Sequence, residues 1–425
     1  MIGGSMKMTS RFAMVAAAGV LLGAAVTSAK AADLGGGCCA DLEERVAELE
    51  ATTARKGNRV VSLQVYGQVN KALLFWDDGE DSDVYVVDND YSGSRVGFTG
   101  SAALKPGWKA GFLVELDIQD AASNQVDNDT DFDDPADEIA IRYSNVYIES
   151  EKFGRITLGQ GSTAADGVAE VVLGNSLRNS DLHHGNDFEI RFAGGASTDL
   201  RLDQWASNLD SSRDDVIRYD SPSIYGFIVS ASWGDDDYAD IALRFKKEWN
   251  SVRVAAAVAY QWDGSGDNTT FVDSASGTAP AFVSLFGDAE VLLGSISVMH
   301  IPTGLYAAGA AGRLEVEEGL HTEADYWYVQ LGIEKKFLSY GSTTVYAEYG
   351  QYNDMAAVFD VDDVAGVDES EAQRWGLGVV QKFDSAAIEL YAQATFWSFE
   401  ATEIGGASED LEDLTTVIVG SRIKF

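Results

Sequence analysis

Apolar and polar residues alternate in the chain over segments of about ten residues, a period of two that predicts β-strands with two different environments. The first segment covers residues 61–76. Its apolar face carries Leu63, Val65, Val69, Leu73 and Phe75, and its polar face carries Gln64, Tyr66, Gln68 and Asn70. Lys71 falls on the apolar face, where a charge is tolerable near a membrane interface or a subunit contact.

The same alternation returns along the rest of the chain, with short turns and longer acidic loops between the segments. The further strands are predicted at 94–104, 109–118, 139–148, 155–161, 216–220, 226–233, 241–249, 252–262, 291–299, 306–314, 327–335, 343–352, 374–383, 387–397 and 415–425. All five prolines fall between strands, as a sheet without edges requires. We therefore predict an all-β fold, an antiparallel transmembrane β-barrel of about 16 strands. A soluble β-sandwich would not need so many strands in one domain.

The two ends of the chain support export to a membrane. Lys7 and Arg11 precede an apolar stretch over 12–26, and Ala29 and Ala31 form a cleavage site, so we expect residues 1–31 to be a removed signal peptide. At the other end an alternating strand closes on Phe425, as is usual in outer-membrane barrels. Ile423 and Phe425 are the expected insertion signal for the barrel-assembly machinery.

Residues 32–58 are expected to form a periplasmic linker with one short helix over 41–56, before a barrel domain over 59–425. Apolar or small residues recur at heptad spacing, namely Cys39, Leu42, Val46, Leu49 and Thr53. This spacing allows a short three-helix coiled coil. A single helix lying on the barrel rim remains an equal alternative.

Several short motifs, in this order, resemble the general-diffusion porins of Gram-negative outer membranes, most closely their alphaproteobacterial branch. They are Leu63-Gln64-Val65-Tyr66-Gly67, Ser94-Arg95-Val96-Gly97-Phe98, Phe153-Gly154-Arg155-Ile156-Thr157-Leu158-Gly159 and Ile217-Arg218-Tyr219-Asp220-Ser221-Pro222. The resemblance implies sixteen antiparallel strands, a homotrimer, and passive diffusion of small hydrophilic solutes and ions through each monomer.

In such porins the third external loop folds into the lumen and narrows it. Here that loop is expected at about 161–215. Its candidate constriction carboxylates are Asp166, Glu170, Asp181, Asp187 and Glu189, and the candidate basic wall opposite them is Arg95, Arg142, Arg218 and Arg244. Opposite charges across a narrow waist orient polar solutes and disfavour apolar ones.

The formal net charge of −38 argues against nucleic-acid binding, because phosphate backbones attract basic surfaces. Acidic pore mouths concentrate cations, so we predict a preference for cations. We expect contact with outer-membrane lipid and lipopolysaccharide and no cofactor or bound metal, since the acidic stretch 127–134 lacks the glycine of a calcium loop. The expected mature start at Ala32-Asp33 resembles barrels that are joined to peptidoglycan.

Three alternatives to a diffusion pore remain. An enzyme is disfavoured, because the chain has only four histidines and none lies in a nucleophile motif. A substrate-selective channel would need an aromatic slide along the lumen, for which Tyr66, Trp76, Tyr328, Tyr346 and Tyr391 are the candidates. An envelope-tethering barrel would have a blocked pore.

Overall fold

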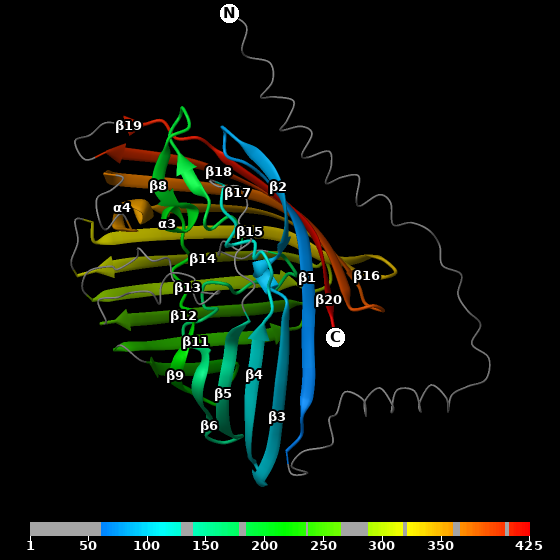
Figure 1. Ribbon diagram of the computed structural model, residues 1–425. Coiled ribbons are helices and arrows are strands. Elements are labelled where there is room, and N and C mark those ends of the chain that lie inside the picture. The colour runs from blue at the N-terminus through cyan, green and yellow to red at the C-terminus, as the bar shows by residue number, and fades with distance from the viewer. Residues whose placement is uncertain are drawn as a thin grey trace, which may run out of the picture.

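The computed structural model describes residues 61–128, 139–177, 184–234, 237–264, 288–317, 321–359, 366–403 and 408–425. These residues form one large antiparallel sheet that closes on itself (Figure 1). The expected signal peptide over 1–31 and the expected helix over 41–56 lie outside the described residues. No described helix is long and apolar enough to cross a membrane.

Sixteen strands make the closed wall, so the predicted fold class is confirmed. They are β1 (Gln64–Asp77), β3 (Arg95–Lys105), β4 (Trp108–Asp117), β5 (Ala140–Ser150), β6 (Gly154–Ser162), β9 (Arg213–Asp220), β10 (Phe227–Gly234), β11 (Tyr238–Trp249), β12 (Val252–Asp263), β13 (Ala289–His300), β14 (Leu305–Val316), β15 (Glu323–Leu338), β16 (Gly341–Asn353), β17 (Val367–Phe383), β18 (Ile388–Glu403) and β20 (Leu414–Lys424). The connections at one end of the barrel are short, and we call this the turn end. The other end, which carries the longer connections, is the loop end.

The barrel closes where the first strand meets the last. β1 pairs with β20 from Gln68 opposite Lys424 to Asp77 opposite Thr415. The backbones of Gly67 and Phe425 exchange two further hydrogen bonds of 3.1 and 3.0 Å. A Cβ atom at Gly67 would lie 2.5 Å from the Phe425 ring and 2.6 Å from the Arg95 carbonyl oxygen, so only glycine allows the final aromatic ring and β3 to come this close to β1.

Four short strands were not predicted: β7 (Glu189–Arg191) and β8 (Ser197–Arg201), which pair with each other, β19 (Ser408–Glu409), and β2. β2 (Ser82–Asp88) pairs with the loop-end half of β1, and a single turn of 3-10 helix, η1 (Asp90–Ser92), separates it from β3, which pairs with the turn-end half. The acidic composition of residues 77–83 indicated a loop there instead. Lys71 faces outward as expected, and its ammonium group lies 3.4 Å from Asp88 and 3.5 Å from Asp120. The carboxylates of Asp88 and Asp120 therefore neutralise the charge of Lys71, which interrupts the apolar face of β1.

Strand alternation separates two surfaces of opposite character. Outward positions carry exposed aliphatic side chains such as Leu292, Leu331 and Leu377. Aromatic pairs border this surface, with Trp375 and Phe396 stacked 4.1 Å apart towards the loop end, and Phe245 and Trp249 5.8 Å apart at the turn end. Inward positions carry buried polar residues, for example Ser297, Gln330 and Thr395. An apolar outside and a polar inside are the requirements of a barrel that holds water within a membrane.

Candidate functional site

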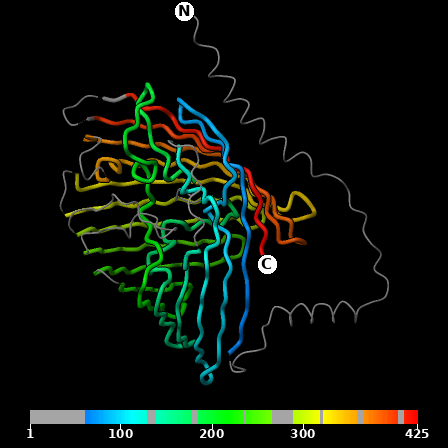
Figure 2. The backbone as a smooth tube through the Cα atoms, in the orientation of Figure 1, coloured from blue at the N-terminus to red at the C-terminus, as the bar shows by residue number. Residues whose placement is uncertain are grey.

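The described residues between β6 and β9, 163–177 and 184–212, fold inside the barrel instead of projecting from it, and we call this segment the inner loop (Figure 2). Its first part, residues 163–177, crosses the inner surface of successive strands. Its backbone N–H groups donate to wall side chains in the order of those strands: Ala164 to Ser232 of β10 (2.8 Å), Ala165 to Asp240 of β11 (2.6 Å), Val171 and Leu173 to Ser295 and Ser297 of β13 (3.1 Å each), Asn175 to Glu334 of β15 (3.0 Å), and Leu177 to the Tyr346 hydroxyl of β16 (3.3 Å).

The sequence explains why the inner loop can lie so close to the wall. An irregular backbone against a wall cannot reach water, so its N–H groups need protein acceptors. The wall supplies Ser, Asp, Glu and Tyr oxygens at inward positions. Ala164, Ala165, Val168 and Ala169 are fully buried, and their small side chains allow the close approach. The inner loop is therefore attached to the wall at several points.

The second part of the inner loop turns back towards the loop end. It contains a hairpin of β7 (Glu189–Arg191) and β8 (Ser197–Arg201), followed by the short helix α3 (Leu202–Trp205). Arg191 donates to Asp78 (2.8 Å) and to the Asn128 carbonyl (3.1 Å), in the first and second loops of the loop end. The backbone of Ala193 donates to Asp410 in the last loop (2.7 Å). The hairpin thus links three loops that follow one another around the loop end of the barrel.

The candidate constriction carboxylates are spread along the inner loop. Asp166 lies at its start, beside Arg213, Arg218 and Arg244, and burial raises the pKa of its carboxyl group against the opposing effect of those arginines. Glu170 is half-buried further along. Asp181 lies outside the described residues.

The other two predicted carboxylates lie in or just before the hairpin. Asp187 pairs with Arg201 at 3.0 Å, and burial raises its pKa. Glu189 accepts a hydrogen bond of 2.6 Å from Ser197. Asp166 and this pair have separate partners at opposite ends of the inner loop, so the described carboxylates do not form one contact cluster.

The four arginines of the predicted basic wall have two different settings. Arg95 and Arg142 flank Glu115, at 3.4 and 3.0 Å, and Arg142 also reaches Asp117 at 3.0 Å. Arg218 donates to the carbonyl of Thr163 (2.6 Å), and Arg244 donates to the carbonyl of Asp166 (2.8 Å). Arg218 and Arg244 therefore hold the root of the inner loop against the wall, a structural contact that the sequence did not indicate.

Asp203 of α3 is a site residue that sequence reasoning missed. Arg201 bridges Asp187 and Asp203, with both ion pairs at 3.0 Å. Burial raises the pKa of Asp203 to about 7, because Arg201 offsets only part of the lost hydration and Asp187 adds repulsion. No spacing motif marks this residue; only the fold of the hairpin brings the three charges together.

A buried arginine lies in the wall beneath the inner loop. Arg374 of β17 has no exposed surface. Its guanidinium lies 5.0 Å from the ring of Tyr328, 5.4 Å from Trp397 and 5.8 Å from Tyr352. The Glu348 carboxylate is 3.9 Å from Arg374 Nε and accepts a hydrogen bond of 2.9 Å from Tyr328.

This arrangement bears on the aromatic slide considered above. Trp76, Tyr328, Tyr346 and Tyr391 are at most 4 % exposed. The Tyr346 hydroxyl accepts a hydrogen bond from the Leu177 amide of the inner loop. The Tyr391 hydroxyl donates a hydrogen bond of 2.6 Å to Asn70 in the adjoining wall. Of the five candidates only Tyr66 keeps partial exposure, so they do not form a continuous track along the passage.

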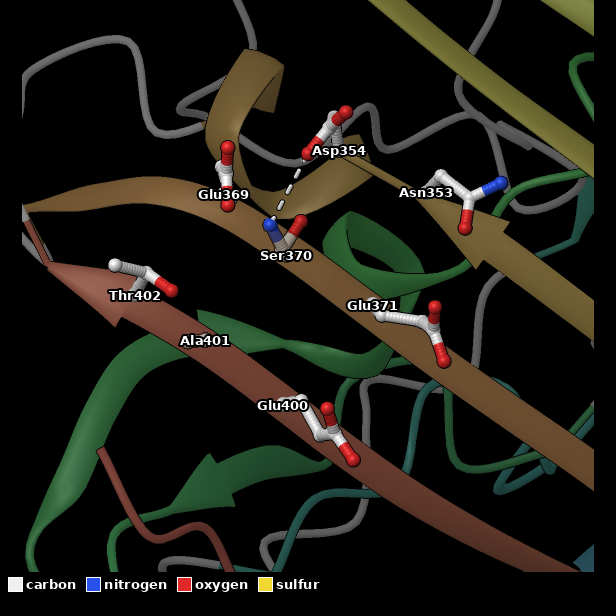
Figure 3. Close-up of a pocket in the computed structure, with 8 residues that line it drawn as sticks. All are labelled: Asn353, Asp354, Glu369, Ser370, Glu371, Glu400, Ala401 and Thr402. Carbon is white, nitrogen blue, oxygen red and sulfur yellow. Dashed lines mark hydrogen bonds between the residues drawn. The ribbon is translucent and has the colours of Figure 1, made fainter. Parts of the chain in front are cut away.

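An acidic pocket of about 440 Å³ lies at the loop end of β16, β17 and β18, lined among others by Asp354, Glu369, Glu371 and Glu400 (Figure 3). Glu371 lies on the same face of β17 as outward-facing Trp375, and Glu400 of β18 is its cross-strand partner. The pocket therefore opens on the outer rim of the wall and not into the lumen. No basic side chain of the described residues lines it, so it adds negative charge around the mouth.

Known proteins place the chain in a family. The model of the Gram-negative porin family matches residues 13–402. No curated protein matches the sequence. Among solved structures, the chain is similar to the anion-selective porin from Comamonas acidovorans (17 % identity, TM-score 0.56, covering 86 % of this chain and 100 % of that one). It is also similar to in-vitro folded OmpT of Vibrio cholerae in its trimer form (16 %, 0.53, 86 % and 100 %) and to OprB of Pseudomonas putida (9 %, 0.54, 91 % and 97 %). The chain belongs to the Gram-negative porin family and is a β-barrel channel of the outer membrane.

Proposed function

We propose that the protein is a diffusion pore for small hydrophilic solutes and ions, with a preference for cations. The observation that carries the proposal is the inner loop, which is fixed by backbone hydrogen bonds to a polar wall over five strands. A fixed loop narrows a water-filled lumen without needing to move for each passage. The net charge of −38 supports the cation preference.

We propose that residues 1–31 are a signal peptide and that residues 32–58 form a periplasmic linker with a short helix. Residues 59–425 form the barrel, and the constriction is formed within residues 161–215. Three copies assemble into a homotrimer; in-vitro folded OmpT of Vibrio cholerae, to which the fold is similar, has a trimer form. The protein is inserted by the barrel-assembly machinery and carries no catalytic site. The short motifs favour the alphaproteobacterial branch, and the Ala32-Asp33 start favours a link to peptidoglycan.

Planar-bilayer recording tests the proposal. Protein refolded in detergent and shown to be barrel-form by its heat-modifiable electrophoretic mobility should give stable conductance steps in 1 M KCl. In a tenfold KCl gradient the reversal potential should have the sign of cation preference. Folded protein that gives no steps would support the envelope-tethering alternative, and an anion-side reversal potential would refute the selectivity alone.

The pKa of Asp203 predicts a pH dependence of that selectivity. A carboxyl group with a pKa raised to about 7 is charged at pH 8 and mostly neutral at pH 6, so acidification removes a negative charge from the inner loop. The raised pKa also makes the folded hairpin more stable as the pH falls from 7 towards 4. In this range Asp203 binds a proton in the folded protein, whereas the same carboxyl group in the unfolded chain binds it only at lower pH. We expect the cation-to-anion permeability ratio to fall roughly 1.5-fold between pH 8 and pH 6.

The matched variants are Asp203→Asn and Asp199→Asn, which lie in the same part of the inner loop. Asp203→Asn removes the titrating group, so its permeability ratio should stay nearly constant across this range. Asp199 is exposed, and its replacement should leave the pH dependence in place. Equal pH dependence in the wild type and in Asp203→Asn would show that another group titrates.

A further inference from the structure

Charge is distributed unevenly along the axis of the barrel. At the turn end, basic side chains occupy inward positions on six strands around the lumen. They are Lys109 of β4, Arg155 of β6, Lys246 of β11, Arg253 of β12, Lys382 of β17, and Arg422 and Lys424 of β20. Their inward direction follows from strand alternation, because each shares parity with buried positions of its own strand or pairs with an inward partner.

Carboxylates neutralise only part of this basic ring. Lys109 pairs with Glu149 (3.2 Å), Arg253 with Glu248 (3.0 Å), Lys382 with Glu334 (3.8 Å) and Arg422 with Glu389 (2.8 Å). Arg155, Lys246 and Lys424 have no carboxylate within 4.0 Å among the described residues. Arg155 lies over the Tyr147 ring at 3.7 Å, and Lys424 lies within electrostatic range of one carboxylate, Glu389, and of three cations, Arg422, Lys382 and Arg95. The lumen at the turn end therefore has an excess of positive charge.

The loop end has the opposite sign. Exposed carboxylates of the first loop and of the hairpin, Glu80, Asp81, Asp83 and Asp199, lie at this mouth, and no described basic side chain is within 4.0 Å of them. The chain has a net charge of −38, so the basic ring at the turn end has the opposite sign to the protein as a whole. The pore is thus negative at the loop-end mouth and positive at the turn-end mouth.

We propose that this axial polarity makes the pore a rectifier of ionic current, a property that rests on the proposed function as a diffusion pore. A negative segment admits cations and excludes anions, and a positive segment does the reverse. When the voltage drives cations inward from the loop end, anions enter from the turn end, and both kinds accumulate where the segments meet. Under the opposite voltage each ion first meets the segment that excludes it, the junction is depleted, and conductance falls.

Ionic strength decides whether the effect is visible. Screening lengths are about 10 Å at 0.1 M salt and about 3 Å at 1 M. At 0.1 M salt the electric field of the wall charges therefore extends across a porin-sized lumen. At 1 M salt the field is screened close to the wall. We expect the currents at +100 and −100 mV to differ roughly twofold in 0.1 M KCl and to be nearly equal in 1 M KCl.

Paired variants separate lumen charge from general rim charge. Lys246→Gln with Lys424→Gln removes two unpaired inward cations. The control is Lys247→Gln with Lys335→Gln. It removes two exposed cations at the same end of the barrel whose side chains lie on the outer face of the wall. None of these four lysines forms an ion pair with a carboxylate in the part of the chain that the structure describes, so both variants should fold. The inward pair should bring the current ratio in 0.1 M KCl close to one, while the outward pair should keep most of the asymmetry.

The orientation of each channel is read with streptavidin and a biotin label on Glu317→Cys at the loop end, in a chain whose Cys38 and Cys39 are serine. Higher current when cations are driven from the labelled side supports the proposal. Symmetric currents at 0.1 M, an asymmetry of the opposite direction, or equal loss in both variant pairs would overturn it. Steps in 1 M KCl without rectification at 0.1 M would leave the diffusion pore standing and refute rectification alone.

Discussion

Replacing residues 164–211 by the dipeptide Asn-Gly is expected to raise the single-channel conductance about threefold in 1 M KCl, because conductance follows the narrowest cross-section of a water-filled lumen. The design exploits the roots of the inner loop. The Thr163 amide donates to the Ser212 carbonyl at 3.4 Å, so the two ends already lie at the distance of paired strands. Asn-Gly is the preferred two-residue hairpin connection.

The loop deletion needs a control for the fold of the barrel, which heat-modifiable electrophoretic mobility supplies. A milder variant, Ser295→Ala with Ser297→Ala, removes the acceptors of the Val171 and Leu173 amides without shortening the chain. It should leave the mean conductance close to the wild-type value and increase the current noise, because a loosened inner loop fluctuates. An unchanged conductance in a folded deletion variant would show that the inner loop does not form the constriction.

Replacing Arg374 by Met is expected to lower the free energy of unfolding by about 3–5 kcal/mol, the usual cost of removing one partner of a buried ion pair. Glu348 would keep a charge in a site with no exposed side-chain surface. The three aromatic rings around the guanidinium would also lose their cation. The urea midpoint of unfolding in detergent, followed by tryptophan fluorescence, measures the change.

Arg313→Met is the matched control, since Arg313 of β14 is half exposed and pairs with Glu315 and Glu323 on the outer face. An exposed pair contributes at most about 1 kcal/mol, so its loss should hardly move the midpoint. Equal effects of the two substitutions would mean that Glu348 is neutral or hydrated in the folded protein. The double variant Arg374→Met with Glu348→Gln should recover part of the loss, because it removes the stranded charge.

The strands could be predicted from the sequence because a barrel wall imposes a period of two on nearly every residue. Each predicted strand overlaps an observed one, and Lys71 was correctly placed on the outer face. β2 was missed because its acidic flank resembles a loop, although Val84 and Val86 alternate outward within it. A short strand interrupted by η1 has too few residues for its period to stand out.

The path of the inner loop could not be predicted in the same way. Its anchors join backbone amides to side chains 68 to 169 residues away, and an amide donor leaves no pattern in the sequence. The resemblance to porins indicated an inward loop at 161–215, but nothing in the chain indicated that Arg218 and Arg244 bind its carbonyl groups. The pKa of Asp203 was equally hidden, since burial and the contact with Arg201 exist only in the fold.

The anchoring of the inner loop also sets an order of assembly. Val171 and Leu173 depend on Ser295 and Ser297, which follow 124 residues later, and Leu177 depends on Tyr346. When residues 163–177 leave the ribosome, the oxygen atoms that will hold them have not yet been synthesised. The inner loop can therefore be fixed in place only after β13 to β16 have joined the wall. With the inner loop as the proposed constriction, a barrel interrupted before that stage of insertion would be wider and leakier than the finished channel.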